Sequence, residues 1–253
     1  MGKTTILQND TDKIVSGSEE HSIWKSIILH LLPGILGGIV YFLIVNFMRE
    51  QGFPSVSALI VAGVLVITPL ELSILIFQSR KNKKKLFGGF LAYLQPLPVW
   101  QYIVWVIIII ISSGLIITLF TPITDYLRGI FHWIPNEMIL DMGLSGVYSK
   151  TALIVTYAFI LIFVVLIGPA VEELYFRGYL LPRMSGKLSN LQHSFLFAVY
   201  HVFTPWMIIT RMIGLLPLIY VVKKKNIYIG IIVHILVNLI DAVMGFAFIA
   251  GMA

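Results

Sequence analysis

The feature that most constrains this chain is a series of long apolar runs, which recur from about residue 24 to the C-terminal end. A run of about 20 apolar residues is long enough to cross the hydrocarbon core of a bilayer as a helix. Hydrophobic residues make up 58% of the 253 residues and charged residues only 12%, whereas soluble domains carry about 25% charged residues. The sequence therefore predicts an all-α, polytopic transmembrane helical bundle.

The apolar runs divide into seven candidate helices, and six or eight remain open as alternatives. The candidates are 24–48, 56–78, 99–120, 151–181, 191–203, 206–222 and 227–250. The run at 191–203 is short for a span, and the next one contains Pro217, which can break a helix. We predict a polar cytoplasmic N-terminal tail at 1–23, followed by one membrane domain at 24–253.

Basic residues gather in three short loops between the apolar runs, at 80–85, 183–187 and 223–225. Lysine and arginine in short loops favour the cytoplasmic side of a membrane. With seven helices the three loops fall on one side, so we predict a multi-pass cell-membrane protein with its N-terminus in the cytoplasm. The first 23 residues have mixed charge and lack the pattern of a cleavable signal, so we expect the first helix to stay attached.

Two features of the composition exclude whole classes of function. The chain has no cysteine, which excludes disulfides, thiolate metal sites and cysteine nucleophiles. The formal net charge is +6, but the basic residues lie in short loops instead of along an amphipathic surface, which argues against a nucleic-acid partner.

Charged residues inside an apolar helix are the most informative, because a charge at the bilayer centre costs about 2.5–3.5 kcal/mol even on insertion scales. Glu172, Glu173 and Arg177 lie within six residues of one such helix. Glu173 and Arg177 are four residues apart with the acid first, so they can pair. Glu172 points about 100° away from Glu173, and we expect it to face a different cavity as a candidate general base.

Two later helices carry polar residues at a spacing of four, namely Phe197 with His201 and His234 with Asn238. Asp241 lies seven residues beyond His234 and therefore on the same helix face. At 1.5 Å per residue, Glu172, His201 and His234 lie about 13–21 Å from the basic loops. A carboxylate and two imidazoles that converge around water suit the hydrolysis of an amide bond.

Other intramembrane peptidase chemistries fit the sequence less well. There is no HExxH string for a site-2 type zinc protease. An aspartyl protease needs two aspartates in adjacent helices, and Asp241 is the only aspartate well inside an apolar run. Residues 143–146 spell the GxSG of a rhomboid-like serine protease, but Ser145 lies in a polar loop, where a turn or cap is the simpler role.

Two further classes of protein stay open as alternatives. The same polar groups could hold helices together in a bacteriocin self-immunity or scaffold protein without proteolysis, and His30 in the first helix is expected to have such a packing role. A small transporter could use the carboxylates for proton coupling. The sequence shows neither internal repeats nor a pair of broken, inverted helices, so it gives the transporter little support.

The three polar motifs together resemble a known family. In order and spacing, EELYFRG at 172–178, Phe197-x-x-x-His201 and His234-x-x-x-Asn238 are similar to the motifs of the CPBP (CAAX protease and bacteriocin-processing, or Abi) intramembrane endopeptidases. The resemblance covers about residues 165–245, and it implies a catalytic core at about 150–250.

The resemblance implies a glutamate-dependent endopeptidase in which Glu172 activates the attacking water. His201 would position that water, while His234 and Asn238 would stabilise the oxyanion. The family is often described as metalloproteases, and Glu172, His201 and His234 could fill three of the four positions around Zn²⁺. Zinc therefore stays open as a cofactor.

Glu173 and Arg177 would form a supporting pair in this family. Asp241 lies outside the motif, and we predict that it orients His234 from behind. The expected partners are membrane lipids and a peptide or protein substrate, with lipid-modified substrates included. The compact length and the lack of cysteine favour a bacterial protein and therefore a membrane-associated peptide, as in pheromone or bacteriocin-related maturation, over CAAX-type processing of a prenylated protein.

Overall fold

The computed structural model describes residues 19–252, which consist of helices and their connecting loops and contain no strand. Five helices are long and apolar enough to cross a membrane, and a bent pair would make a sixth. The predicted all-α membrane bundle is thereby confirmed. Most of the predicted N-terminal tail, 1–23, lies outside the described residues.

The first half of the chain supplies three of the candidate spans. Its helices are α2 (Ile23–Glu50), α3 (Val56–Ala62), η1 (Gly63–Ile67), α4 (Thr68–Lys81), α5 (Val99–Ile130) and the short η2 (Asn136–Met138). The segments α3, η1 and α4 run on as one span, in which η1 is π-helical.

The second half begins with one continuous span that contains the first polar motif. This span consists of α6 (Lys150–Phe159), η3 (Ile160–Ile167), α7 (Gly168–Glu172), η4 (Glu173–Leu180) and η5 (Leu181–Arg183). Both η3 and η4 are π-helical, a conformation that occurs mostly in short stretches and often at functional sites. The remaining helices are α8 (Ser189–Tyr200), η6 (Pro205–Met207), α9 (Ile208–Gly214), α10 (Leu216–Lys224) and α11 (Ile227–Ala250).

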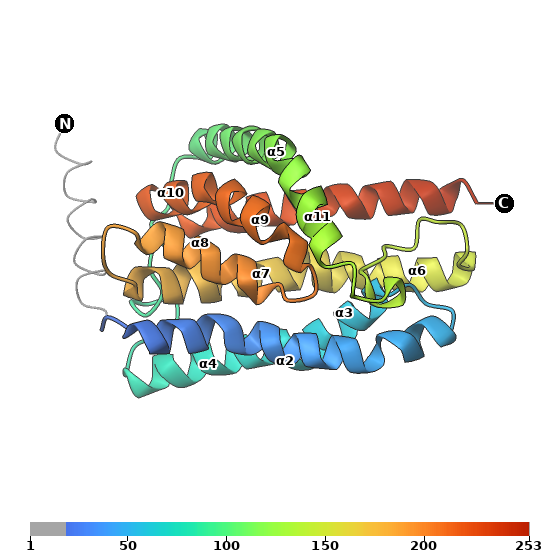
Figure 1. Ribbon diagram of the computed structural model, residues 1–253. Coiled ribbons are helices and arrows are strands. Elements are labelled where there is room, and N and C mark those ends of the chain that lie inside the picture. The colour runs from blue at the N-terminus through green and yellow to red at the C-terminus, as the bar shows by residue number, and fades with distance from the viewer. Residues whose placement is uncertain (1–18, 253) are drawn as a thin grey trace.

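The span from α6 to η5 occupies the middle of the bundle (Figure 1). It packs against α4 through α7, against α2 through η4, and against α11 along η3, α7 and η4. Helix α8 packs on α2 and α9, and α5 covers α9 on the outside. The span with the first motif therefore lies next to α11, which carries the third motif, and it contacts α8, which carries the second, through η5 and Arg177.

Two prolines account for the main differences from the predicted helix limits. Helix α5 continues to Ile130, ten residues past its predicted end, and contains Pro122 in its interior. A proline removes one backbone hydrogen bond and can kink a helix without ending it. Pro217 lies instead in the first turn of α10, where proline is favoured, and the predicted helix 206–222 is bent there by 42°.

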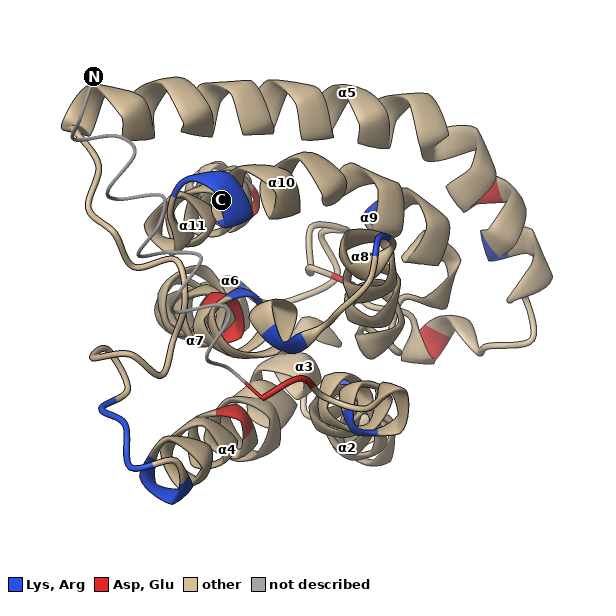
Figure 2. Ribbon diagram, turned by 90° about the vertical axis from the view of Figure 1, so that its left-hand side faces the viewer, with Lys and Arg blue, Asp and Glu red and all other residues tan. Residues whose placement is uncertain are grey.

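The predicted basic loops follow helices that end on one side of the bundle. Figure 2 views this end, where α4 runs into the cluster at 80–85 and α10 into the cluster at 223–225. The segment 183–187 follows η5 at the same end. The common placement of the three clusters agrees with the positive-inside pattern, while the assignment of this end to the cytoplasm stays a prediction.

The outer surface of the bundle is apolar, as expected where it contacts lipid. Along α5 a row of large side chains at a spacing of four is 51–65% exposed: Ile103, Ile107, Ile111 and Leu115. Polar contacts lie inside instead. The Nε2 atom of His30 in α2 lies 2.9 Å from Nδ1 of His193 in α8, and both rings are fully buried, which confirms the packing role predicted for His30.

Candidate active site

Glu173 and Arg177 form the centre of the polar interior. Both side chains are 0% exposed, and the guanidinium Nη1 lies 3.1 Å from Glu173 Oε1. The ion pair predicted from their spacing is therefore present. The Arg177 guanidinium also lies 3.9 Å from the centre of the Phe197 ring, which is a cation–π contact. Arg177 thus joins the first motif to the second.

His234 joins the third motif to the same carboxylate. Its Nδ1 atom lies 3.2 Å from Glu173 Oε1. Gly230, one turn earlier in α11, permits this approach, since a Cβ atom there would lie 2.8 Å from Glu173 Oε2. Glu173 therefore contacts both Arg177 and His234, and it fixes the position of α11 relative to η4.

His201 lies at the C-terminal end of α8 with its Nδ1 atom 2.9 Å from the carbonyl oxygen of Phe197. A carbonyl oxygen only accepts hydrogen bonds, so Nδ1 carries the hydrogen and Nε2 of a neutral ring keeps its lone pair. The Nδ1 atom of His234 faces a carboxylate, and the same reasoning leaves Nε2 of His234 available. Both rings are held through Nδ1 and present Nε2 for chemistry.

Glu172, the predicted base, ends α7 and lies beside the tyrosine that precedes His201. Its Oε1 atom is 3.5 Å from the hydroxyl of Tyr200, and its Oε2 atom is buried without a hydrogen-bond partner among the described residues. His234 is near enough to act electrostatically on both Glu172 and His201. The structure therefore brings together the carboxylate and the two imidazoles that the motifs predict.

Asn238 and Asp241 lie farther along α11. The side-chain nitrogen of Asn238 donates a 2.8 Å hydrogen bond to the carbonyl of Val164 in η3, so one of its two N–H groups is already engaged. Asp241 is exposed, and the partner of the His234 ring is Glu173. The prediction that Asp241 orients His234 is therefore wrong.

The sequence analysis missed two charged residues near this site, one of them buried and the other half-buried. Glu71 in α4 is 0% exposed and accepts a 3.0 Å hydrogen bond from Tyr200. Arg211 in α9 donates a 3.0 Å hydrogen bond to Thr204 and interacts electrostatically with Glu172. Each is a lone charge in an apolar run, and the cost of a charge at that depth would have been sufficient to identify both.

The serine protease alternative gains no support from the geometry. Ser145 is exposed in a turn whose two glycines, Gly143 and Gly146, have φ angles of +85° and +81°. This is the turn role that the polar context predicted.

The predicted zinc ligands do not form a metal-binding group of three or more His, Cys, Asp or Glu side chains among the described residues. Glu172, His201 and His234 lie in the same site. The Nδ1 atoms of both rings, however, already contact protein groups, namely the carbonyl oxygen of Phe197 and the carboxylate of Glu173. Zinc at these three residues stays a prediction, and the chemistry below does not depend on it.

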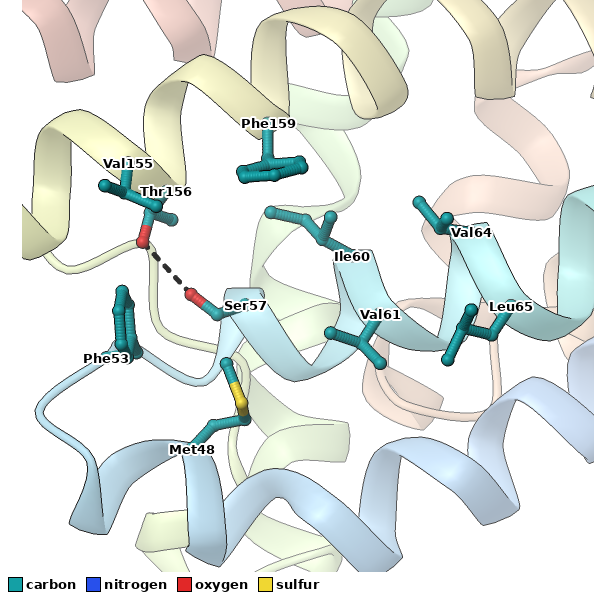
Figure 3. Close-up of a pocket in the computed structure, with 10 residues that line it drawn as sticks. All are labelled: Met48, Phe53, Ser57, Ile60, Val61, Val64, Leu65, Val155, Thr156 and Phe159. Atoms are coloured by element: carbon teal, nitrogen blue, oxygen red, sulfur yellow. Dashed lines mark hydrogen bonds between the residues drawn. The ribbon is translucent and has the colours of Figure 1, made fainter.

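A cavity of about 290 Å³ lies elsewhere, between α3, α6 and the end of α2. Figure 3 shows its ten lining residues, which are apolar except for the hydrogen-bonded Ser57 and Thr156. Thr156 precedes Glu172 by 16 residues of one continuous span, or about 24 Å at the α-helical rise. The cavity therefore lies apart from the polar groups of the candidate active site.

One comparison with known proteins gives a match. Residues 154–240 match the family model described as type II CAAX prenyl endopeptidase Rce1-like, and all three polar motifs fall inside this segment. No curated protein and no solved structure matches the chain.

Proposed function

We propose that this chain is a member of the CPBP family and an intramembrane endopeptidase that cleaves a membrane-associated peptide or protein; the Rce1-like match of residues 154–240 supports this. The family supports a CAAX-type intramembrane protease in general terms. The substrate, the catalytic residues and the bond that is cleaved are part of the proposal.

The observation that carries the proposal is the convergence of one half-buried carboxylate with two imidazoles that are each anchored through Nδ1. Glu172 offers a carboxylate oxygen without a protein partner among the described residues. His201 and His234 are held by Phe197 and Glu173 in orientations that leave Nε2 available. Such a constellation suits proton transfer from water, because the base and the positioning groups are fixed in advance.

In the proposed mechanism Glu172 takes a proton from water as the water oxygen attacks the substrate carbonyl carbon. His201 accepts a hydrogen bond from this water through Nε2. Protonated His234 donates from Nε2 to the developing oxyanion, and the carboxylate of Glu173 stabilises the charge on the ring. The second N–H of Asn238 is available for the same oxyanion. Glu172 then returns its proton to the leaving amine as the C–N bond breaks.

The substrate is expected to enter from the lipid or from the membrane surface. The span that carries Glu172 is surrounded by other helices, and the outside of the bundle is apolar. A peptide already associated with the membrane reaches such a site at less cost than one that must leave water. We therefore favour a membrane-associated peptide, lipid-modified ones included, as the substrate class.

Comparative peptidomics tests the proposal across all the peptides of the membrane at once, so that no single substrate has to be chosen. Membranes of cells that carry the native chain are compared with membranes that carry Glu172→Gln or His201→Ala. Loss of a general base typically lowers the rate by about 10²–10⁴-fold, so peptides that the native chain generates should disappear from both variants.

The matched controls make the same chemical changes at exposed positions, as Glu137→Gln and His132→Ala, and they should keep the native peptide pattern. If both site variants accumulate normally and leave every peptide unchanged, the chain is no peptidase. A function that survives both variants would then favour the immunity or scaffold alternative.

A further inference from the structure

Arg211 in α9 is a cation inside an apolar segment, and the proposed mechanism gives it no role. Helix α9 is half of the bent pair that would make the sixth candidate span. Arg211 precedes Lys223 by 12 residues, at most about 18 Å of helix, and Glu172 precedes Arg183 by 11 residues, or about 17 Å. Both side chains therefore start at similar depths below the basic end of the bundle, where a charge is costly and commonly functional.

The two arginines near the site differ in their surroundings. Arg177 is 0% exposed and is paired with Glu173. Arg211 is half-buried, and among the described residues it forms no ion pair with an acidic side chain. The three groups assigned to the chemistry are half-buried as well: Glu172, His201 and His234. The site thus contains one enclosed arginine that joins helices and one arginine in its accessible part.

The guanidinium of Arg211 is held on one side. Its Nη2 atom donates a 3.0 Å hydrogen bond to the hydroxyl of Thr204 and lies 3.6 Å from the sulfur of Met207. Its Nη1 atom is buried and has no hydrogen-bond partner among the described residues. A buried charged donor without an acceptor is unfavourable, and an anionic oxygen is the acceptor that stabilises it most.

Thr204 connects Arg211 to the end of α8. The backbone N–H of Thr204 donates a 3.0 Å hydrogen bond to the carbonyl oxygen of His201, and its side chain accepts from Arg211. The charge of Arg211 acts on both His201 and Glu172, but no hydrogen bond joins it to Glu172 among the described residues. An anion bound at Nη1 would therefore lie beside the reacting groups without replacing either of them.

We propose that Arg211 is a substrate-binding residue that takes a carboxylate of the peptide close to the bond that is cleaved. This carboxylate belongs either to an Asp or Glu side chain of the peptide or to its C-terminus. Arginine suits both sources, because its planar fork can donate two parallel hydrogen bonds to one carboxylate. The inference rests on the proposed peptidase function for its kinetic test but not for its binding test.

The kinetic test uses mixtures of hexapeptides with randomised sequences and an N-terminal decanoyl chain, which are presented in detergent micelles. The neutral mixture has an amidated C-terminus and no acidic residue. A second mixture differs only in its free C-terminal carboxylate, and a third differs only in that it contains Asp and Glu. One of the charged mixtures should show an apparent KM about 10- to 100-fold below that of the neutral mixture, and which one does so identifies the source of the carboxylate.

Arg211→Gln should remove this preference by raising the KM of the charged mixture while kcat stays nearly unchanged, because it removes binding that substrate and transition state share. Arg80→Gln is the matched control at an exposed position in the last turn of α4, and it should keep the native preference. Thr204→Val removes the hydroxyl that Arg211 holds, so it should keep the preference as well, whatever its effect on kcat.

Three results would overturn the inference and leave the proposed function intact. The native chain could cleave all three mixtures with equal KM, the preference could survive in Arg211→Gln, or Thr204→Val could abolish it as completely as Arg211→Gln does. If Arg211→Gln does not accumulate, Arg211→Lys takes its place and should raise the KM of the charged mixture about tenfold, because an ammonium group lacks the planar fork. A native KM in that variant would overturn the inference too.

The binding test uses Glu172→Gln, so that the peptides stay intact, and measures thermal unfolding with each mixture, since a ligand of the folded chain raises its Tm. One charged mixture should raise the Tm more than the neutral mixture does, and the difference should vanish when Arg211→Gln is added. Equal shifts with all three mixtures would refute the inference even if the peptidase proposal fails as well. A selective shift, in a protein whose native chain cleaves nothing, would keep the carboxylate site and refute the peptidase proposal.

Discussion

Replacing Arg177 by methionine is the strongest test of how the site is held together. The native guanidinium is fully buried, 3.1 Å from Glu173 and 3.9 Å from the centre of the Phe197 ring. Methionine fills much of the same volume and keeps a contact with the ring, but it leaves the carboxylate of Glu173 buried with His234 as its remaining described partner. The substitution therefore isolates a charge without opening a large cavity.

The size of the effect follows from these contacts. Breaking a buried ion pair costs about 3–5 kcal/mol, because the remaining charge is desolvated and uncompensated. The lost contact between cation and ring contributes about 2 kcal/mol at a desolvated site. We expect Arg177→Met to lower the free energy of unfolding by about 5 kcal/mol.

The double variant Glu173→Gln/Arg177→Met removes both charges. It should lose only about 2 kcal/mol relative to the native chain, mainly from the ring contact. The double variant should thus be about 3 kcal/mol more stable than Arg177→Met. The coupling in a double-mutant cycle is the cost of the double variant minus the summed costs of the two single variants, and we expect its magnitude to be at least about 3 kcal/mol, the upper end of the usual range.

The assay is denaturant unfolding of the purified chain in one detergent, with the native chain, both single variants and the double variant measured side by side. Arg128→Met is the matched control, because Arg128 also lies over an aromatic ring, 5.2 Å from Trp206, but is exposed. It should cost about 0.5–1 kcal/mol. A loss below about 1 kcal/mol for Arg177→Met, or a double variant as unstable as the sum of the singles, would refute the reasoning.

Two further changes probe the packing around the site and one end of the bundle. Gly230→Ala places a Cβ atom 2.8 Å from Glu173 Oε2 and should destabilise the chain by about 1–3 kcal/mol. The control is Gly63→Ala, whose Cβ atom would have nothing within 4 Å and should not destabilise the chain. Equal effects of the two variants in thermal unfolding would contradict this prediction. Burial lowers the pKa of His21 from 6.5 to about 3. As the pH falls, His21 is therefore protonated in the unfolded chain before it is protonated in the folded chain. The stability that the neutral ring contributes above pH 6.5 should be lost as the pH falls toward 3. The free energy of unfolding of His21→Gln, measured between pH 3 and 6.5, should depend less on pH than that of the native chain. If the dependence is unchanged, His21 is not the group that causes it.

The long helices were predictable from the sequence because composition and length alone determine them. In a membrane a long apolar run has few alternatives to a helix, because its backbone polar groups must be hydrogen-bonded within the protein. The predicted helix limits agree with those of the structure within a few residues, except near two prolines. Pro122 and Pro217 are chemically identical, yet one lies inside α5 and the other begins α10. Helix α5 packs along α9, and such a contact between distant segments is not contained in a local sequence pattern.

Within the site, spacing predicted contacts along one helix better than contacts between helices. The i to i+4 rule gave the ion pair of Glu173 and Arg177. The rule that i and i+7 share a face placed Asp241 behind His234, but side chains on a helix lean toward its N-terminus. His234 accordingly reaches toward Glu173, beside Gly230, and away from Asp241.

Glu71 shows why a motif search alone gives an incomplete site. The family match begins at residue 154, and Glu71 is 101 residues before Glu172 in the sequence, yet both carboxyl groups contact the hydroxyl of Tyr200. Helix α4 makes this possible because it packs directly on α7 and η4. The matched segment supplies the groups assigned to the chemistry, and the first half of the chain adds a buried carboxyl group beside them.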